Sequence, residues 1–148
     1  MKDIIIQLIS AFAGSLGFTL VFQLRKKLLV AASVGGLLNW GAYLLLSPLF
    51  KSEFVPCFLA AAVAVVYCEL SARVFKAPVT LFLVPAVIPS VPGGSLFYTM
   101  SSIVQKDWEA AKSYGMTTAE FALGIAAGIC LAVVVFSIIN SIVRYTKK

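Results

Sequence analysis

The chain has 148 residues, of which 61% are hydrophobic and only 12% are charged, about half the charged fraction usual in soluble globular domains. With a mean hydropathy of +1.00, this composition excludes a water-soluble single domain and an intrinsically disordered chain. The length accommodates about five membrane spans of roughly 20 residues each. We therefore expect an all-α polytopic membrane protein.

Several kinds of function are excluded by what the sequence lacks. Histidine is absent, so the commonest metal ligand and the usual acid/base group near neutral pH are both missing. The three cysteines lie in apolar runs without CxxC spacing and are expected to be small buried hydrophobes: Cys57, Cys68 and Cys130. The net charge of +6 comes from short basic clusters between apolar runs, which indicates membrane topology and not nucleic-acid binding. We expect no catalytic residues, metal or cofactor.

Five apolar runs are predicted to cross the bilayer, which makes residues 1–148 a single transmembrane domain. They cover residues 4–24, 28–46, 55–74, 79–100 and 121–143. This arrangement places four basic and five acidic residues on one side, and eight basic residues with Glu69 on the other. Because Lys and Arg are retained in the cytoplasm, the N-terminus is predicted outside and the C-terminus inside.

The segment between the last two runs is predicted to be helical, because its apolar residues recur at steps of three and four. The fourth helix is expected to continue beyond the membrane and stop at Gly115. Residues 117–120 form a capping-box pattern that is expected to open the final span and to explain Glu120. Gly124 and Gly128 form a GxxxG step, which predicts close packing of the last helix on a neighbour.

The fourth run contains three prolines followed by two glycines, over residues 85–94. Each proline removes a helix donor and each glycine loosens the backbone, so this span is predicted to be broken. A break inside hydrocarbon is tolerated only where protein or water supplies hydrogen-bond partners. We therefore expect the broken segment to line a cavity near the middle of the membrane.

A break also creates a helix N-terminus, whose free amides and positive dipole favour an anion. Discontinuous helices of this kind hold substrate carboxylates in secondary transporters. We expect Gly93, Gly94 and Ser95 to present backbone donors to a carboxylate, with Tyr98 one turn further along. The alternative is a proline kink that serves packing alone.

Few other polar residues fall within the predicted spans. Asn39 lies in the second span, where it would make an interhelical hydrogen bond or contact a substrate. Glu69 and Arg73 stand at i and i+4 near the end of the third span, in the order that favours an ion pair. The alternative makes Glu69 a proton carrier or gate residue with Arg73 beside it.

Three segments carry a resemblance to a known family. They are the GFTLVF segment at 17–22, the ELSAR segment at 69–73 that leads to KAP at 76–78, and the IPSVPGG segment at 88–94. In this order and spacing they resemble the small, C-terminal-half-type membrane subunit of the bacterial threonine/serine exporter family. Pro85 and Ser90 depart from the family's pattern and leave the substrate open.

The resemblance implies an exporter of small hydrophilic carboxylates in the bacterial plasma (inner) membrane. The substrates would be hydroxy amino acids such as threonine and serine, or dicarboxylates such as succinate. It also implies a larger membrane subunit as partner in an oligomeric assembly, and it adds Pro89 and Pro92 to the substrate-binding candidates.

The expected mechanism is alternating access driven by an ion gradient, since the chain has no Gly-rich nucleotide-binding loop. A passive channel and a non-transporting accessory subunit are the alternatives. An intramembrane enzyme is the least supported class, because no nucleophile lies beside a base in the sequence.

Overall fold

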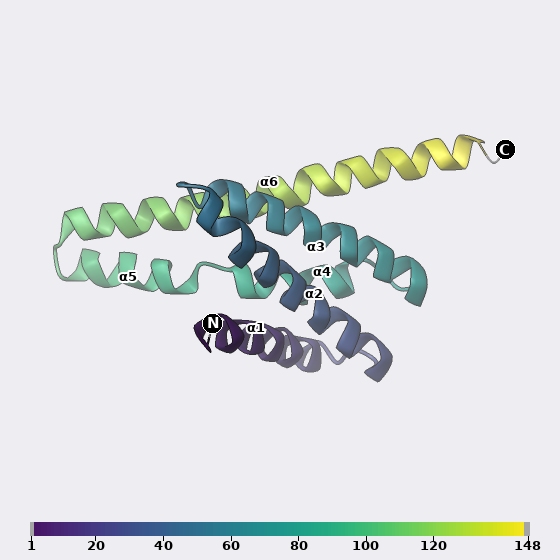
Figure 1. Ribbon diagram of the computed structural model, residues 1–148, viewed down its shortest axis with the longest axis horizontal. Helices are drawn as coiled ribbons and strands as arrows, with labels where there is room; N and C mark the ends of the chain where they lie inside the picture. The colour runs from purple at the N-terminus through teal and green to yellow at the C-terminus, as the bar shows by residue number, and fades with distance from the viewer. Residues whose placement is uncertain (1, 147–148) are drawn as a thin grey trace.

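The computed structural model describes residues 2–146, with side chains throughout except at 140 and 143–146. The elements in chain order are α1 (Lys2–Val21), α2 (Lys26–Leu46), η1 (Ser47–Leu49), α3 (Phe54–Phe75), α4 (Thr80–Val87), η2 (Ile88–Ser90), α5 (Gly93–Val104) and α6 (Trp108–Thr146) (Figure 1). No strand occurs in this described range, so the expected all-helical fold class is confirmed.

Four helical segments are long and apolar enough to cross a membrane: α1, α2 together with η1, α3 and α6. A fifth crossing results if α4 with η2 and α5 count as one span, which is bent by 50° at a short break. The expected break in the fourth span is therefore confirmed. Helices α1 to α4 form a bundle in which α2 packs on its three neighbours (Figure 1).

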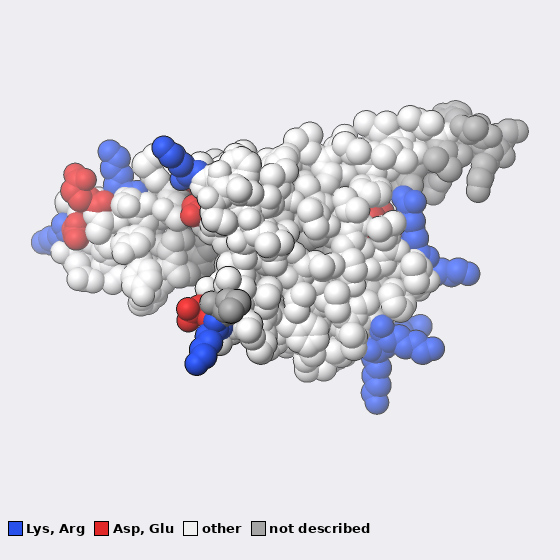
Figure 2. Space-filling model, viewed as in Figure 1, with Lys and Arg blue, Asp and Glu red and all other residues white. Residues whose placement is uncertain are grey.

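The two ends of this bundle differ in charge. We call the end with the α1–α2 and α3–α4 turns the basic end, after Arg25, Lys26, Lys27, Arg73 and Lys76. The opposite acidic end, where α1 begins and α2 meets α3, holds Asp3, Glu53 and Glu120 together with Lys2 and Lys51. Figure 2 shows almost only basic groups at the first end, mixed groups at the second and a largely uncharged middle. Lys147, Lys148 and the side chain of Arg144 from the predicted basic set lie outside the described part.

Helix α6 is longer than a membrane span requires. Its 39 residues correspond to about 58 Å of helix, against a hydrocarbon thickness of about 30 Å. The first third of α6 pairs with α5 in a hairpin that projects past the acidic end of the bundle (Figure 1). The middle of α6 packs on α3, and its last turns extend away from the bundle (Figure 1).

The projecting hairpin corrects two sequence expectations. The fourth span does not continue to Gly115, because α5 ends at Val104 and Lys106 adopts a left-handed conformation with φ of 60°. The amide of Ala110 donates to Asp107 Oδ1 at 3.1 Å, so Asp107 caps the first turn of α6. The residues expected to cap the final span, 117–120, lie inside α6.

Glu120 has a different structural role from the one expected. Its Oε2 accepts hydrogen bonds from the amide of Glu53 at 2.9 Å and from Ser52 Oγ at 3.0 Å. Glu120 therefore places a negative charge at the N-terminus of α3, where the helix dipole favours it. Glu53 in turn accepts a hydrogen bond from the Tyr43 hydroxyl at 2.8 Å, which joins α2, α3 and α6 at the acidic end.

The GxxxG step makes the close contact that the sequence predicts. A Cβ built on Gly124 would lie 2.6 Å from Phe54 O, and one built on Gly128 would lie 2.5 Å from Phe58 O. Only glycine at these two positions allows α6 to lie this close to the backbone of α3.

The cysteines follow the expectation in two of three positions. Cys57 and Cys68 on α3 are buried, whereas Cys130 on α6 is exposed. Cys130 lies on a face of α6 that no other described helix covers, so its apolar run marks a span and not a buried core. No cluster of three potential metal ligands occurs among the described residues.

Candidate functional site

The break in the fourth span follows directly from the proline spacing. Pro85 is accommodated inside α4, so the first helical segment continues to Val87 and tightens into η2 at Pro89. Val91 is extended, with φ of −62° and ψ of 124°, as expected for a residue that precedes proline. Pro92 then occupies the N-cap of α5, which begins at Gly93.

Asn39 of α2 holds the carboxyl end of the α4–η2 segment. Its Nδ2 donates to Ala86 O at 2.9 Å and to Ser90 Oγ at 2.8 Å. Asn39 and Ala86 are fully buried, and Ser90 is 5% exposed. Asn39 thus satisfies a carbonyl at the helix end that would otherwise lack a donor, and a solute could reach its side chain only if α2 and α4 separated.

The η2 turn packs closely against α1 and α2. Gly36 faces both Ser15 of α1 and the ring of Pro89, with no room for a Cβ between them. Next to this contact lies a cavity of about 280 Å³, bordered by Pro89, Trp40 and the polar residues Gln7 and Ser10 of α1. The indole of Trp40 donates to Gln7 Oε1 at 3.3 Å. Pro89 therefore borders a small, partly polar cavity.

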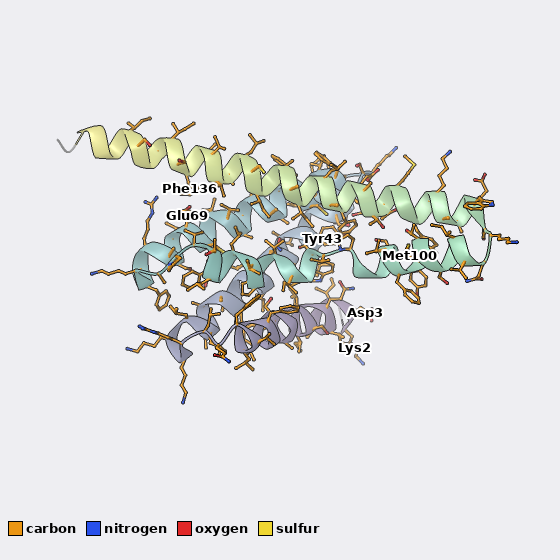
Figure 3. All side chains as sticks on the ribbon, turned by 180° about the vertical axis from the view of Figure 1, so that it is seen from behind. Lys2, Asp3, Tyr43, Glu69, Met100 and Phe136 are labelled. Atoms are coloured by element: carbon orange, nitrogen blue, oxygen red, sulfur yellow. The ribbon has the colours of Figure 1, made fainter. Side chains whose placement is uncertain are left out.

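The break lies between the middle of the bundle and its acidic end. Asn39, which contacts Ser90, is seven residues before Leu46 at the end of α2, or about 10 Å along a helix of about 31 Å. In Figure 3, Met100 on α5 lies farther out than Lys2 and Asp3 at the start of α1. The contact therefore lies about 5 Å from the middle of α2, and the expected position of the break near the middle of the membrane stays a prediction.

The N-terminus of α5 leaves backbone donors free. Pro92 provides no side-chain cap, and no acceptor for the amides of Gly94 and Ser95 is found within the described residues. A Cβ built on Gly93 or Gly94 would meet no atom within 4 Å. These amides therefore lie at an open surface of the chain, where an anion would find donors and no steric obstacle.

Side chains from α5 and α6 flank this helix end. Thr118 Oγ1 lies 3.0 Å from Ser95 Oγ and 2.8 Å from Tyr114 O. The ring of Tyr98 stacks on that of Tyr114, with centroids 5.3 Å apart and an interplanar angle of 30°. Thr118 was not among the residues expected at the site, because nothing in its spacing indicates that α6 returns beside Ser95.

Glu69 and Arg73 lie away from the break, at the basic end of α3. The local ion pair that their spacing favours stays a prediction. The Arg73 guanidinium carbon lies 5.8 Å from the ring centroid of Phe136 on α6. Figure 3 shows Glu69 and Phe136 near each other on adjacent helices. Arg73 therefore contributes to the contact between α3 and α6, and Glu69 is half-buried beside it.

A family comparison gives this geometry a functional context. The sequence model described as "Threonine/Serine exporter, ThrE" matches residues 7–135, which include every helix of the bundle and the complete break. The chain belongs to the threonine/serine exporter family. Membership indicates transport of the threonine/serine-exporter type and a multi-pass membrane protein. No significant match was found among curated proteins or among solved structures.

Proposed function

We propose that this exporter-family chain supplies one half of a carboxylate-binding site in a two-subunit secondary exporter. The substrates are small hydrophilic carboxylates, either hydroxy amino acids such as threonine and serine or dicarboxylates such as succinate. The other half comes from a larger membrane subunit. The chain lies in the bacterial plasma membrane with the N-terminus outside and the C-terminus in the cytoplasm, since eight basic residues fall on the C-terminal side.

The observation that carries the proposal is the uncapped N-terminus of α5. The amides of Gly94 and Ser95 have no acceptor in the described part of the chain, and the two glycines leave the approach open. A carboxylate placed there would accept charge-assisted hydrogen bonds and interact with the positive end of the helix dipole. Tyr98 and Thr118 are near enough to contact the rest of a small solute.

The exposure of the α5 N-terminus also indicates that a second subunit is needed to complete the binding site. A transport site must exclude water and lipid from its substrate, yet a methyl group added at Gly93 or Gly94 would meet no neighbouring atom within 4 Å. The missing wall must therefore come from another chain or another copy. Tyr98 is 54% exposed and Phe97 is 66% exposed, which leaves aromatic surface beside the site for such a contact.

The break can also act as the moving part of alternating access. The α4–η2 segment is fixed to α2 through Asn39, whereas α5 is fixed to α6 through Ser95 and Thr118. Along the chain, Val91 and Pro92 connect these two segments, and the contact of α6 with α3 would have to slide as they move. A rotation there would carry the α5 amides from one side of the site to the other without breaking either set of contacts.

Glu69 is the candidate for proton coupling, because it is half-buried and no hydrogen bond to its carboxylate is found among the described residues. We expect Glu69→Gln to abolish the dependence of export on the pH gradient. Arg73→Gln, which removes the contact with Phe136, should lower protein stability and leave that dependence in place. The same pH dependence in Glu69→Gln and in the parent protein would remove Glu69 from the mechanism.

The two-subunit proposal is tested in cells that lack the chain, its presumed partner or both. Intracellular threonine, serine and succinate are measured after each deletion and after each gene is restored. We expect one of these carboxylates to accumulate in all three strains and to fall only when both genes are present. Full export by the partner alone would instead identify this chain as an accessory.

Transport in proteoliposomes distinguishes an exporter from a channel. A carrier exchanges labelled substrate against an excess of unlabelled substrate on the other side, and its rate saturates. A flux that is linear in concentration and shows no exchange would identify a channel and contradict alternating access.

A further inference from the structure

A large cavity lies at the basic end, far from the break. It has a volume of about 730 Å³ and lies between the α1–α2 turn and the α3–α4 turn. Both turns are closed by a residue in the left-handed conformation, Gln23 with φ of 51° and Lys76 with φ of 51°. Four basic residues border it, and no acidic residue does: Arg25, Lys26, Lys27 and Lys76.

These cations have no role in the proposed transport site. The tendency of Lys and Arg to remain on the cytoplasmic side explains why these residues lie on one side of the membrane. It does not explain why all four border the same cavity. All four are exposed, so each can reach a ligand without a buried partner being displaced. The N-terminus of α2, which has no side-chain cap at Arg25, borders the same cavity and adds the positive end of its helix dipole. The cavity is therefore suited to an anionic group that carries several acceptor oxygens.

An apolar groove continues from this cavity along α4. It has a volume of about 250 Å³ and shares Phe22, Leu24 and Leu81 with the cavity. Its other borders are Thr80, Val84 and Pro85, so it extends from the basic end along the outer side of α4. Beyond Thr80, no polar residue lines it. A small hydrophilic solute would gain no favourable contact with these apolar side chains, whereas a lipid acyl chain can pack against them.

We propose that the cavity and the groove together bind one anionic phospholipid, such as phosphatidylglycerol. The phosphate lies among Arg25, Lys26, Lys27 and Lys76, and one acyl chain follows the groove past Leu81 to Val84. A basic pocket between helices at the cytoplasmic face is a setting in which lipid phosphates are recognised. The proposal does not depend on the transport function.

The test uses the purified chain in a neutral detergent, with bound lipid counted by native mass spectrometry and affinity measured by titration. We expect one phosphatidylglycerol per chain, bound at least about tenfold more tightly than phosphatidylcholine of the same chain length. Glycerophosphoglycerol, inorganic phosphate and succinate test the anionic group without acyl chains. Equal affinity for any of these three would overturn the proposal and indicate a small-anion site.

Two variants separate the head group from the acyl chain. Lys26→Gln/Lys27→Gln/Lys76→Gln should lose the preference for phosphatidylglycerol, and Val84→Trp should weaken binding at least about tenfold by filling the groove without changing charge. The matched control is Lys51→Gln/Lys106→Gln/Lys112→Gln, which removes three lysines from the acidic end and the hairpin and should bind as the parent does. Parent-like binding by Val84→Trp, or equal losses in the two triple variants, would contradict a specific lipid site.

Discussion

The two parts of α6 meet different surroundings, although both are rich in apolar residues. From Gly124 onward, small residues let α6 lie against the backbone of α3. Before Glu120, α6 pairs with α5, and the hairpin leaves large side chains exposed, with Trp108 at 67% and Met116 at 61%. Small residues thus mark where the chain packs on itself, whereas exposed aromatic residues mark surface left for lipid or another chain.

The largest expected effect comes from breaking the close contact. In Gly128→Leu the new Cβ would lie 2.5 Å from Phe58 O. Because this is a backbone atom, no change of side-chain rotamer can relieve the clash. We expect α6 to separate from α3, with a loss of about 3 kcal/mol or more in stability and little folded protein after extraction. Thermal unfolding in detergent measures the change.

Gly17→Leu on α1 is the matched control, because its Cβ would meet no atom within 4 Å. Its melting temperature should stay close to that of the parent. Parent-like stability in Gly128→Leu would mean that α6 is not packed on α3 as described.

An intermediate effect is expected where the bundle meets the break. Asn39→Ala leaves Ala86 O and Ser90 Oγ without their donor, at a cost of about 1–2 kcal/mol. Ser90→Ala removes only one of the two acceptors and should cost less. A double-mutant cycle between the two changes should give a coupling energy of about 0.5 kcal/mol or more; full additivity would show that Asn39 and Ser90 do not interact.

The smallest effect on the isolated chain is expected in the hairpin. Tyr114→Ala removes the ring that stacks on Tyr98, at a cost of about 0.5–1.5 kcal/mol. Because this surface is proposed to meet a partner, the same change should weaken co-purification with the larger subunit more than it lowers the melting temperature. An unchanged yield of complex would limit the role of the hairpin to lipid contact.

The sequence predicted those features that depend on backbone chemistry alone. Three prolines and two glycines required a break, and GxxxG required a close helix contact, whatever the neighbours are. The residue at which α4 ends was not predictable, because whether Pro85 stops a helix depends on what packs around it. The role of Glu120 was missed for a similar reason, since the amide that it binds belongs to Glu53, 67 positions earlier.

The site was predictable only in its backbone part. The motif at residues 88–94 located the free amides of α5, but the contact of Thr118 with Ser95 depends on how α6 folds back. The i, i+4 spacing of Glu69 and Arg73 predicted only a local pairing and did not indicate that Arg73 lies against Phe136 of another helix. Spacing along one helix cannot report which neighbouring helix competes for a side chain.

The most direct test of the central claim is export by Gly93→Leu and Gly94→Leu, with the protein assembled with its partner. Both positions are open, so the variants should insert and fold, while the added side chains cover the amides of α5. Gly14→Leu, an equally open position on α1, is the control. We expect export to fall at least about tenfold in the first two variants and to be unchanged in the control. Parent-like export by folded Gly93→Leu and Gly94→Leu would contradict a carboxylate site at the break.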